Sequence, residues 1–291
     1  MTQLDLPPHG IALAANPQIP DALVVAREMD SFLRDAGVKR RTIGLIGEEA
    51  LTRELASGAF DLLIALGGDG TVLRAGHLCA PLHIPLMGVN MGRFGFLTQC
   101  RRDEWQSVFP KLLTGEYQIE NRMMLRADHW RLDRQLSSWL VINDAVVCRG
   151  DIVRPVRLKA RVDGYSVASY VADGLIASTP TGSTAYALAV GGPIMPPELR
   201  NILIVPVAPH LSMDRAVILP EGASVTIAVE TDHYAVLSVD GQTPVPLESG
   251  DEVRITADEN SVKFVRLHDP GHFYRTLANY MEQNPSITGE S

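Results

Sequence analysis

The sequence predicts an α/β N-terminal domain with a parallel sheet, followed by a mainly antiparallel β-rich domain. At 291 residues the chain is long enough for two domains, and its 46% apolar and 21% charged residues are typical of a globular protein with a sizeable core. The first third alternates short apolar runs with segments of helical periodicity, which indicates βαβ units. From about residue 120, short strand-like runs separated by turn residues replace the helices. We expect domains over 1–118 and 119–267, with one short helix and a disordered tail in 268–291.

The first third begins with an apolar run at 10–17, closed by Asn16-Pro17, which predicts a strand. A helix follows, with apolar residues at helical spacing, Asp21 placed to cap its start and Gly37 to end it. Further strands are expected at 42–47, 60–68 and 84–90, and further helices at 48–58, 71–80 and 103–114. Pro110 is expected to kink or shorten the last of these helices.

The β-rich part contains seven apolar runs that favour strands. They occupy 139–149, 156–172, 174–179, 201–209, 224–230, 234–241 and 251–256. Asp163-Gly164 interrupts the second run and indicates a hairpin turn, because Asp-Gly adopts positive φ angles readily. Asp240-Gly241 is interpreted as a turn of the same kind.

Composition excludes several classes of function. A formal net charge of −8 argues against nucleic-acid binding, which depends on a basic surface. Cys79, Cys100 and Cys148 fit neither a disulfide framework nor a zinc site, and none of the eight histidines lies in a metal-binding pattern. No secretion signal or membrane-length apolar segment is visible, so we expect a cytoplasmic protein that does not bind membranes.

The segment "LLIALGGDGTVLRAG" (62–76) carries the first candidate site. Glycines after a strand let the backbone turn sharply beside a ligand, and the start of the following helix favours an anion. The P-loop and the GxGxxG fingerprint are both absent. Asp69 could be a plain turn residue, but its place in a βα connection, where ligands bind in α/β sheets, favours a functional role.

A second candidate cluster lies at 172–194. Its loop carries five hydroxyl side chains, which either satisfy a polar loop or bind ribose, amide or phosphate groups: Ser178, Thr179, Thr181, Ser183 and Thr184. Asp173 precedes this loop and, like Asp69, stands beside a glycine. Asn143-Asp144 interrupts a strand-like run, which indicates either an edge strand or a ligand contact.

Taken together, these segments resemble the NAD kinase family. The matching segments follow the family's order over about residues 10–280: "GGDGT" (67–71), "GVNMGRFGFLT" (88–98), "ND" (143–144), "DGLIASTPTGSTAYALAVGGPI" (173–194), "PHLSMDR" (209–215) and "VDGQ" (239–242). Diacylglycerol kinases, sphingosine kinases and phosphofructokinases carry similar glycine–aspartate loops. The long "DGLIASTPTGSTAY" string narrows the resemblance to the NAD kinases.

The resemblance implies transfer of the γ-phosphoryl of Mg²⁺-bound ATP to the 2′-hydroxyl of the adenosine ribose of NAD, giving NADP. It also implies the fold of the NAD kinase-like and diacylglycerol kinase-like superfamily, with the C-terminal segment 268–291 returning to the first domain. A homodimer or homotetramer is expected, with NAD bound between domains and partly across subunits.

The same resemblance assigns residues to roles. Asp69 is expected beside the reacting hydroxyl as general base, and the backbone of Gly67, Gly68, Gly70 and Thr71 near the donor phosphates. Asn143 and Asp144 are expected to contact adenosine and its ribose, and Asp173 to lie near the nicotinamide. The remaining expected NAD contacts are Gly70, Phe96, Thr184, Ala185, Tyr186 and Ala189.

Three positions depart from the family pattern: Asp144 replaces a common glutamate, Ala189 a common serine, and Ala216 a frequent proline. None of these departures is at Asp69, so the expected activity is unchanged. They bear on NAD affinity or on the preference between NAD and NADH. Two alternatives stay open: a related kinase acting on a lipid or sugar, and a nucleotide sensor without catalysis. ATP or polyphosphate as donor, and feedback by NADP, also stay open.

Overall fold

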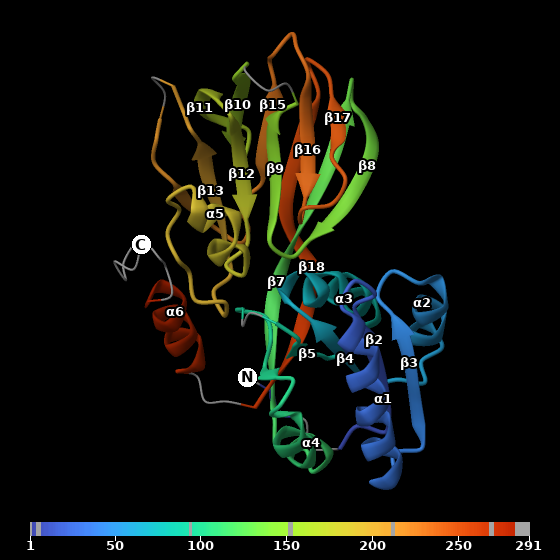
Figure 1. The fold of residues 1–291 in the computed structure, drawn as a ribbon. Helices are drawn as coiled ribbons and strands as arrows, with labels where there is room; N and C mark the ends of the chain where they lie inside the picture. Colours follow the sequence, from blue (N-terminus) through green and yellow to red (C-terminus); the bar gives the residue numbers. More distant parts are fainter. Residues whose placement is uncertain are drawn as a thin grey trace. The chain divides into compact units, whose positions relative to one another are not determined.

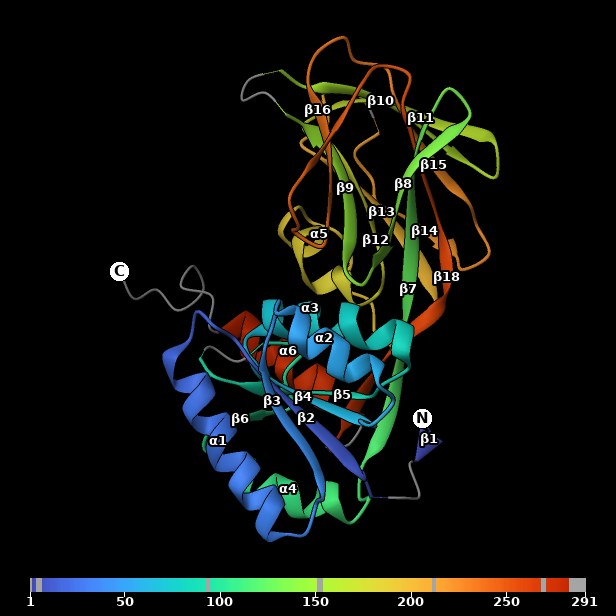
Figure 2. The same cartoon turned by 90° about the vertical axis from the view of Figure 1, so that its right-hand side faces the viewer.

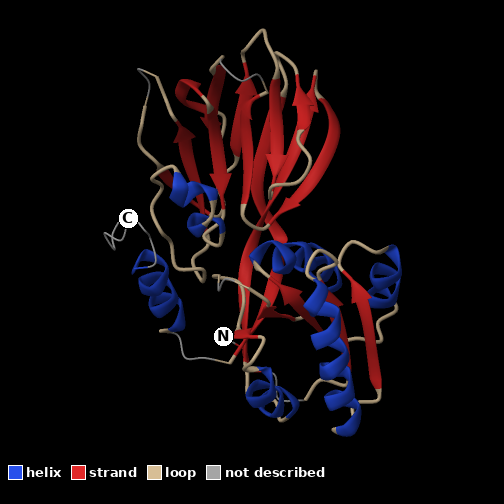
Figure 3. Cartoon of the chain, in the orientation of Figure 1, coloured by secondary structure: helices blue, strands red, loops and turns tan. Residues whose placement is uncertain are grey.

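The computed structural model describes residues 2–3, 7–92, 95–150, 154–210, 213–267 and 271–282. The chain divides into two compact units: unit 1 is Met1–Asn121 with Val262–Ser291, and unit 2 is Arg122–Ser261. Figure 1 labels their elements, Figure 2 shows them from a second side, and Figure 3 separates helices from strands by colour. The functional division at 118/119 stays a prediction. The expected tail, and parts of the motifs at 88–98 and 209–215, fall outside the described residues.

Unit 1 contains the expected parallel sheet, in the order β3-β2-β4-β5. Its elements are β2 (Gly10–Ala15), α1 (Pro20–Asp35), β3 (Arg40–Leu45), α2 (Glu49–Ala56), β4 (Leu62–Gly67), α3 (Asp69–Cys79), a short 3-10 turn η1 (Ala80–Leu82), β5 (Leu86–Asn90), β6 (Cys100–Arg101), α4 (Trp105–Leu113) and α6 (His272–Glu282). The end of β18 adds a strand parallel to β5, with Phe264 opposite Leu86. The short strand β1 (Thr2–Gln3) pairs with the start of β7.

Helices cover both faces of this sheet. Side chains of α1 and α4 share one core with alternate residues of β2, β4 and β5, among them Ile11, Ile64 and Met87. On the opposite face, α2 and α3 pack closely against the strands because the strands carry glycine there. A Cβ on Gly44 would lie 3.0 Å from Leu51 of α2, and one on Gly88 would lie 2.7 Å from Val72 of α3. The alternation of large and absent side chains along the strands thus decides which helix packs on which face.

Two local predictions in unit 1 are corrected. Asp21 does not cap α1: the N-cap is Ile19, Pro20 occupies the first helical position, and Asp21 lies in the first turn. The helix α4 includes Pro110 and continues to Leu113, so it is not shortened there, and the expected kink stays a prediction. Gly37 ends α1 with φ +86°, as expected of a left-handed C-terminal glycine.

Unit 2 consists mainly of antiparallel strands in two layers around one core. Its elements are β7 (Gln118–Arg131), β8 (Arg134–Val141), β9 (Asp144–Arg149), β10 (Val156–Val162), β11 (Tyr165–Ala172), β12 (Gly174–Ser178), η2 (Gly182–Thr184), α5 (Tyr186–Ala189), β13 (Asn201–Val207), β14 (Val217–Pro220), β15 (Val225–Val229), β16 (Ala235–Val239), β17 (Val245–Leu247) and β18 (Glu252–Arg266). The first residues of β7 and the last of β18 belong to unit 1.

One layer has the order β14-β13-β12-β9-β16-β17, and the other pairs β11-β10-β15-β18. Inward-facing residues of both, such as Val147, Leu158 and Ile227, form one buried cluster. The outer face of β12 and β13 is covered by α5, whose Ala187 packs with Ile176 and Leu203. The loop after β12 contacts the residue before β9 through a hydrogen bond from the Thr179 N–H to the Asn143 carbonyl.

The expected fold class is confirmed, and so is the hairpin at Asp163-Gly164, which joins β10 to β11 with positive φ at both residues. The three cysteines are unpaired, and Cys79 and Cys100 are buried. Among the described residues, no helix is both long and apolar enough to cross a membrane.

Candidate active site

The glycine loop of unit 1 joins the end of β4 to the start of α3. Gly67 is the last residue of the strand, Gly68 is the extended N-cap residue, and Asp69 is the first residue of the eleven-residue helix. The first-turn N–H groups of α3 therefore point out of the carboxyl end of the sheet with the positive end of the helix dipole. This arrangement can bind an anion such as a phosphate.

Packing explains the individual loop residues. A Cβ on Gly67 would lie 2.2 Å from Thr71 Oγ1, so only glycine lets Thr71 pack beneath the strand end. The buried Thr71 hydroxyl accepts a hydrogen bond from Asn16 Nδ2 at 2.8 Å, which ties the loop to the end of β2. Nothing lies within 4 Å of a Cβ built on Gly68 or Gly70, so a ligand can approach the backbone there.

Asp69 is held by a second loop. The backbone N–H of Phe96 donates to Asp69 Oδ2 at 2.8 Å, and that of Leu97 donates to Oδ1 at 3.0 Å. A Cβ on Gly95 would lie 2.3 Å from both carboxylate oxygens. The carboxylate is therefore fixed in one position, and Gly95 is required by its close approach. Sequence reasoning missed Gly95, because the contact joins residues 26 positions apart.

Phe96, expected in the NAD site, lies next to Asp69 through its backbone. Its ring contacts Phe273 and Tyr280 of α6, with centroids 6.2 and 5.2 Å apart. Within unit 1, the described part of the C-terminal segment thus packs against the loop that holds Asp69.

Both ends of the loop that holds Asp69 are anchored by buried polar groups. Asn90 Oδ1 accepts a hydrogen bond from the Gly92 N–H at 2.6 Å, and the Gln99 N–H donates to the Gly88 carbonyl at 2.7 Å. Arg266 donates to both Glu120 oxygens, at 3.2 and 3.1 Å, and to Gln99 Oε1 at 3.5 Å. The buried, bidentate ion pair of Arg266 and Glu120 therefore contacts the loop at Gln99.

In unit 2, Asn143-Asp144 lies at the start of β9, and this strand runs between β12 and β16. The edge-strand explanation is therefore wrong. Asn143 is fixed through its backbone: its carbonyl accepts hydrogen bonds from the Thr179 N–H at 2.9 Å and from Ser178 Oγ at 3.0 Å. Its side-chain Oδ1 is buried and has no hydrogen-bond partner among the described residues. An orphaned acceptor of this kind points to a ligand.

The hydroxyl-rich loop after β12 mainly stabilises itself. Four hydroxyls donate to backbone carbonyls: Ser178 to Asn143 and Thr179, Thr179 to Ile142, Ser183 to Pro180, and Thr184 to Thr181. Gly182 is required, because a Cβ there would lie 2.1 Å from the Asn143 carbonyl oxygen. Four hydroxyl hydrogens are thus used by backbone carbonyls, and Ser178 and Thr179 bond to the carbonyls of Asn143 and Ile142.

Asp144 is a buried carboxyl group, 6% exposed. Burial, and secondarily the nearby Asp240 carboxylate, raise its pKa to about 7 from an ordinary 3.8. The pKa of the partly exposed Tyr186 in α5 is also raised, first by burial and then by Cys148, Asp173 and Asp144. Tyr186 therefore lies within electrostatic reach of two predicted NAD contacts.

Asp173 and Asn143 are not brought together directly. Asp173 precedes β12 and forms an ion pair with Arg149 at 3.2 Å, whereas Asn143 contacts the residues after β12. Ala185 lies between η2 and α5, and Ala189 is exposed at the end of α5.

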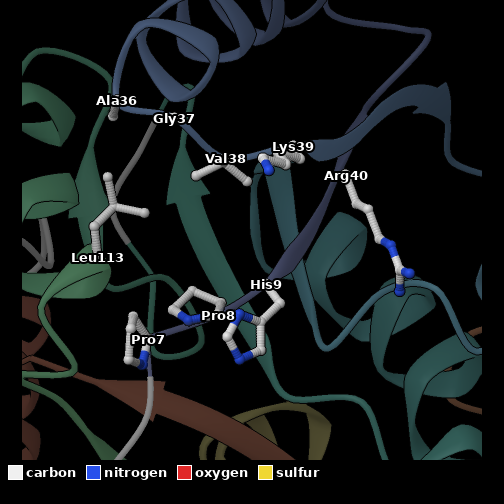
Figure 4. Close-up of a pocket in the computed structure, with 9 residues that line it drawn as sticks. All are labelled: Pro7, Pro8, His9, Ala36, Gly37, Val38, Lys39, Arg40 and Leu113. Carbon is white, nitrogen blue, oxygen red and sulfur yellow. The ribbon is translucent and has the colours of Figure 1, made fainter.

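Two cavities in unit 1 lie at the opposite end of the parallel strands, with volumes of about 430 and 520 Å³. Figure 4 shows the smaller one, lined by His9 before β2 and by Lys39 and Arg40 at the start of β3. None of the predicted site residues lines either cavity. In the described part of the chain, no three His, Cys, Asp or Glu side chains gather as a metal site.

Comparison with known proteins identifies the family of the chain. The models of the ATP-NAD kinase N-terminal and C-terminal domains match residues 22–117 and 142–267. The chain is 38% identical over 284 residues to an NAD kinase of Heliobacterium modesticaldum, covering 96% of this chain and 99% of that one. It is 37% identical over 267 residues to an NAD kinase of Chloroflexus aurantiacus, covering 92% and 96%. The chain belongs to the NAD kinase family.

The fold of this NAD kinase family member matches solved structures. Yeast NADH kinase complexed with NADH has a TM-score of 0.85 at 23% identity, covering 98% of this chain and 91% of that one. An NAD kinase from Archaeoglobus fulgidus in complex with ATP has a TM-score of 0.74 at 22% identity, covering 93% and 98%. At these identities the likeness establishes the NAD kinase fold.

Proposed function

We propose that the chain is an ATP-dependent NAD kinase that phosphorylates the 2′-hydroxyl of the adenosine ribose of NAD. The observation that carries the proposal is the Asp69 carboxylate, fixed at the mouth of a glycine turn by two backbone N–H groups. An aspartate that served only as a turn residue would not require a glycine at position 95, where a Cβ would lie 2.3 Å from both carboxylate oxygens. A catalytic carboxylate does require such a fixed position, because it must meet the reacting atom in one geometry.

Asp69 is proposed as the general base. A carboxylate has about four lone-pair sites, so two N–H bonds leave room for a ribose hydroxyl. As the O2′–P bond forms and the bond from the γ-phosphorus to the β,γ-bridging oxygen breaks, the hydroxyl proton passes to Asp69 and ADP leaves. General-base catalysis supplies roughly 10²–10⁴-fold, and alignment and charge stabilisation supply more.

The donor phosphates are assigned to the Gly67–Thr71 backbone and the start of α3. The open space around Gly68 and Gly70 supports this assignment, because a phosphate must approach the N–H groups directly. Mg²⁺ is proposed to arrive with ATP and to neutralise charge on the transferring phosphoryl group.

Gly70 and Phe96, and separately a group of unit 2 residues, are each proposed to contact the acceptor NAD. Asn143 Oδ1, buried and without a partner among the described residues, suits an amine or hydroxyl donor of adenosine. Asp144 is proposed to contact the ribose and Asp173 to lie near the nicotinamide. Thr184, Ala185, Tyr186 and Ala189 are proposed to line the same pocket. We further propose a cytoplasmic homodimer or homotetramer, testable by light scattering.

The test is direct. The protein is incubated with NAD, Mg²⁺ and ATP, and NADP is detected with an NADP-specific dehydrogenase. Parallel reactions replace NAD with diacylglycerol, sphingosine or fructose 6-phosphate, and ATP with polyphosphate, while ADP release or phosphate transfer is followed. NADP formation that exceeds turnover of the other acceptors supports the proposal. Faster turnover of a lipid or sugar supports the related-kinase alternative, and folded protein inactive with every donor supports the sensor.

A further inference from the structure

The turn between β16 and β17 contains an aspartate with an unusual set of contacts. Asp240 and Gly241 have φ angles of +50° and +67°, as expected of a tight hairpin turn. The Asp240 carboxylate accepts hydrogen bonds from three backbone N–H groups. Oδ2 accepts the Ile142 N–H at 2.8 Å, and Oδ1 accepts the N–H groups of Asn143 and Asp144 at 2.7 and 3.0 Å. In return, the Asp240 N–H donates to the Asp144 carbonyl at 2.9 Å.

The chain provides a matched comparison in the other Asp-Gly hairpin. Asp163 has φ +51° and is followed by Gly164 at +84°, and its side chain accepts a hydrogen bond from the Ser224 N–H at 2.8 Å. Both turns therefore require positive φ angles at the aspartate and at the glycine. What distinguishes Asp240 is the convergence of three consecutive N–H groups on one carboxylate, which only an acceptor-only group with several lone pairs can satisfy.

We propose that Asp240 is a positioning residue for the acceptor nucleotide, holding residues 142–144 so that Asn143 Oδ1 and the Asp144 carboxyl group face NAD. The inference rests on the proposed assignment of Asn143 and Asp144 to NAD.

The backbone of Asn143 supports this role, because it is fixed from two sides. Asp240 holds its N–H, and Thr179 N–H and Ser178 Oγ hold its carbonyl. Both backbone groups are engaged, whereas the buried side-chain Oδ1 has no hydrogen-bond partner among the described residues and can accept one from a ligand. Its position is then determined by the Asp240 carboxylate as much as by the loop after β12.

The decisive variant is Asp240→Asn, with Asp163→Asn as matched control. Asparagine tolerates positive φ and keeps the shape of the side chain, but its amide turns N–H groups toward backbone N–H groups. We expect NAD affinity, measured by titration calorimetry, to fall at least about tenfold, since hydrogen bonds to a charged group are lost. The KM for Mg-ATP should stay within about twofold. Amide hydrogen exchange over 142–144 should accelerate. Asp163→Asn should change none of the three.

A second variant guards against misfolding. Asp240→Gly removes the carboxylate while relaxing the positive φ, so the turn itself should tolerate it. It should show the same loss of NAD affinity. Wild-type NAD affinity in both folded variants, unchanged exchange over 142–144, or an equal rise in the KM for ATP would each overturn the positioning role. If the wild-type chain itself fails to bind NAD, the proposed function fails. The exchange rates of 142–144 then decide separately whether Asp240 holds this segment.

Discussion

Gly95→Ala tests whether the exact position of the Asp69 carboxylate matters for catalysis. The added Cβ would lie 2.3 Å from both Oδ atoms and 2.4 Å from Cγ, whereas ordinary Cβ contacts begin near 3.4 Å. The carboxylate or the Phe96–Leu97 backbone must therefore move by about 1 Å. The negative charge and the titratable group both remain, so the change isolates geometry from chemistry.

The expected result is a kcat about a hundredfold lower, because a displacement of about 1 Å in a catalytic group costs about 10²-fold. This loss corresponds to about 2.7 kcal/mol in the activation barrier. NADP formation at saturating NAD and Mg-ATP measures it. Gly222→Ala is the control, since Gly222 has no positive φ and a Cβ there meets nothing within 4 Å. A folded Gly95→Ala protein with near-wild-type kcat would refute the argument that Asp69 acts from its observed position.

Three further outcomes follow from the same contacts. Gly182→Ala should raise the KM for NAD at least about tenfold in steady-state assays, because its Cβ would meet the Asn143 carbonyl oxygen at 2.1 Å. An unchanged KM would show that this carbonyl contact does not position the acceptor. The Asp144 pKa of about 7 means that the folded chain holds a proton that the unfolded chain releases near 3.8, so the free energy of unfolding should fall as pH rises from about 4 to 7. Asp144→Asn should remove up to about 4 kcal/mol of this fall, measured by urea unfolding at pH 4.5 and 8, and parallel wild-type and variant curves would contradict the burial argument. Arg266→Met should destabilise the fold by about 3–5 kcal/mol in urea, because the buried Glu120 then loses the Arg266 guanidinium. The double variant with Glu120→Leu should recover much of the loss, and a single variant as stable as wild type would contradict this expectation.

The sequence predicted best where side-chain periodicity alone decides the structure. The βα units of unit 1 have fully buried strands between helices with one apolar face, so 60–68 and 71–80 closely match β4 and α3. The segment 139–149 was interpreted as one strand, but Asn143 separates β8 from β9.

The long strands β7 and β18 were missed in whole or in part because they carry charges that are paired only in three dimensions. β7 (Gln118–Arg131) contains Glu120 and Arg126 and looks too polar for a buried strand. Its charges meet partners far along the chain, Arg266 for Glu120 and Asp258 for Arg126. For the same reason β18 was expected to end near 256, although it runs on through the buried Asp258 to Arg266. No local pattern reports such pairs.

In the candidate site too, some residues could be recognised from local sequence and others act only through contacts between distant segments. Asp69, Asn143 and Asp144 could be selected from sequence because a carboxylate in a βα turn and polar residues within a strand are locally unusual. Gly95 and Asp240 could not, since each acts through a contact between segments distant in sequence. As local turn patterns, Asp240-Gly241 and Asp163-Gly164 are alike, and the family match of "VDGQ" (239–242) does not by itself reveal the contacts of the Asp240 carboxylate.

The most direct measurement is the time course of NADP formation by the wild-type chain and by Asp69→Asn, with NAD and Mg-ATP saturating. Wild type should form many NADP molecules per chain. The folded Asp69→Asn variant should turn over at least about a hundredfold more slowly. Absence of NADP with folded wild-type protein, or equal rates for the two chains, would contradict the assignment of Asp69 as the base of an NAD kinase.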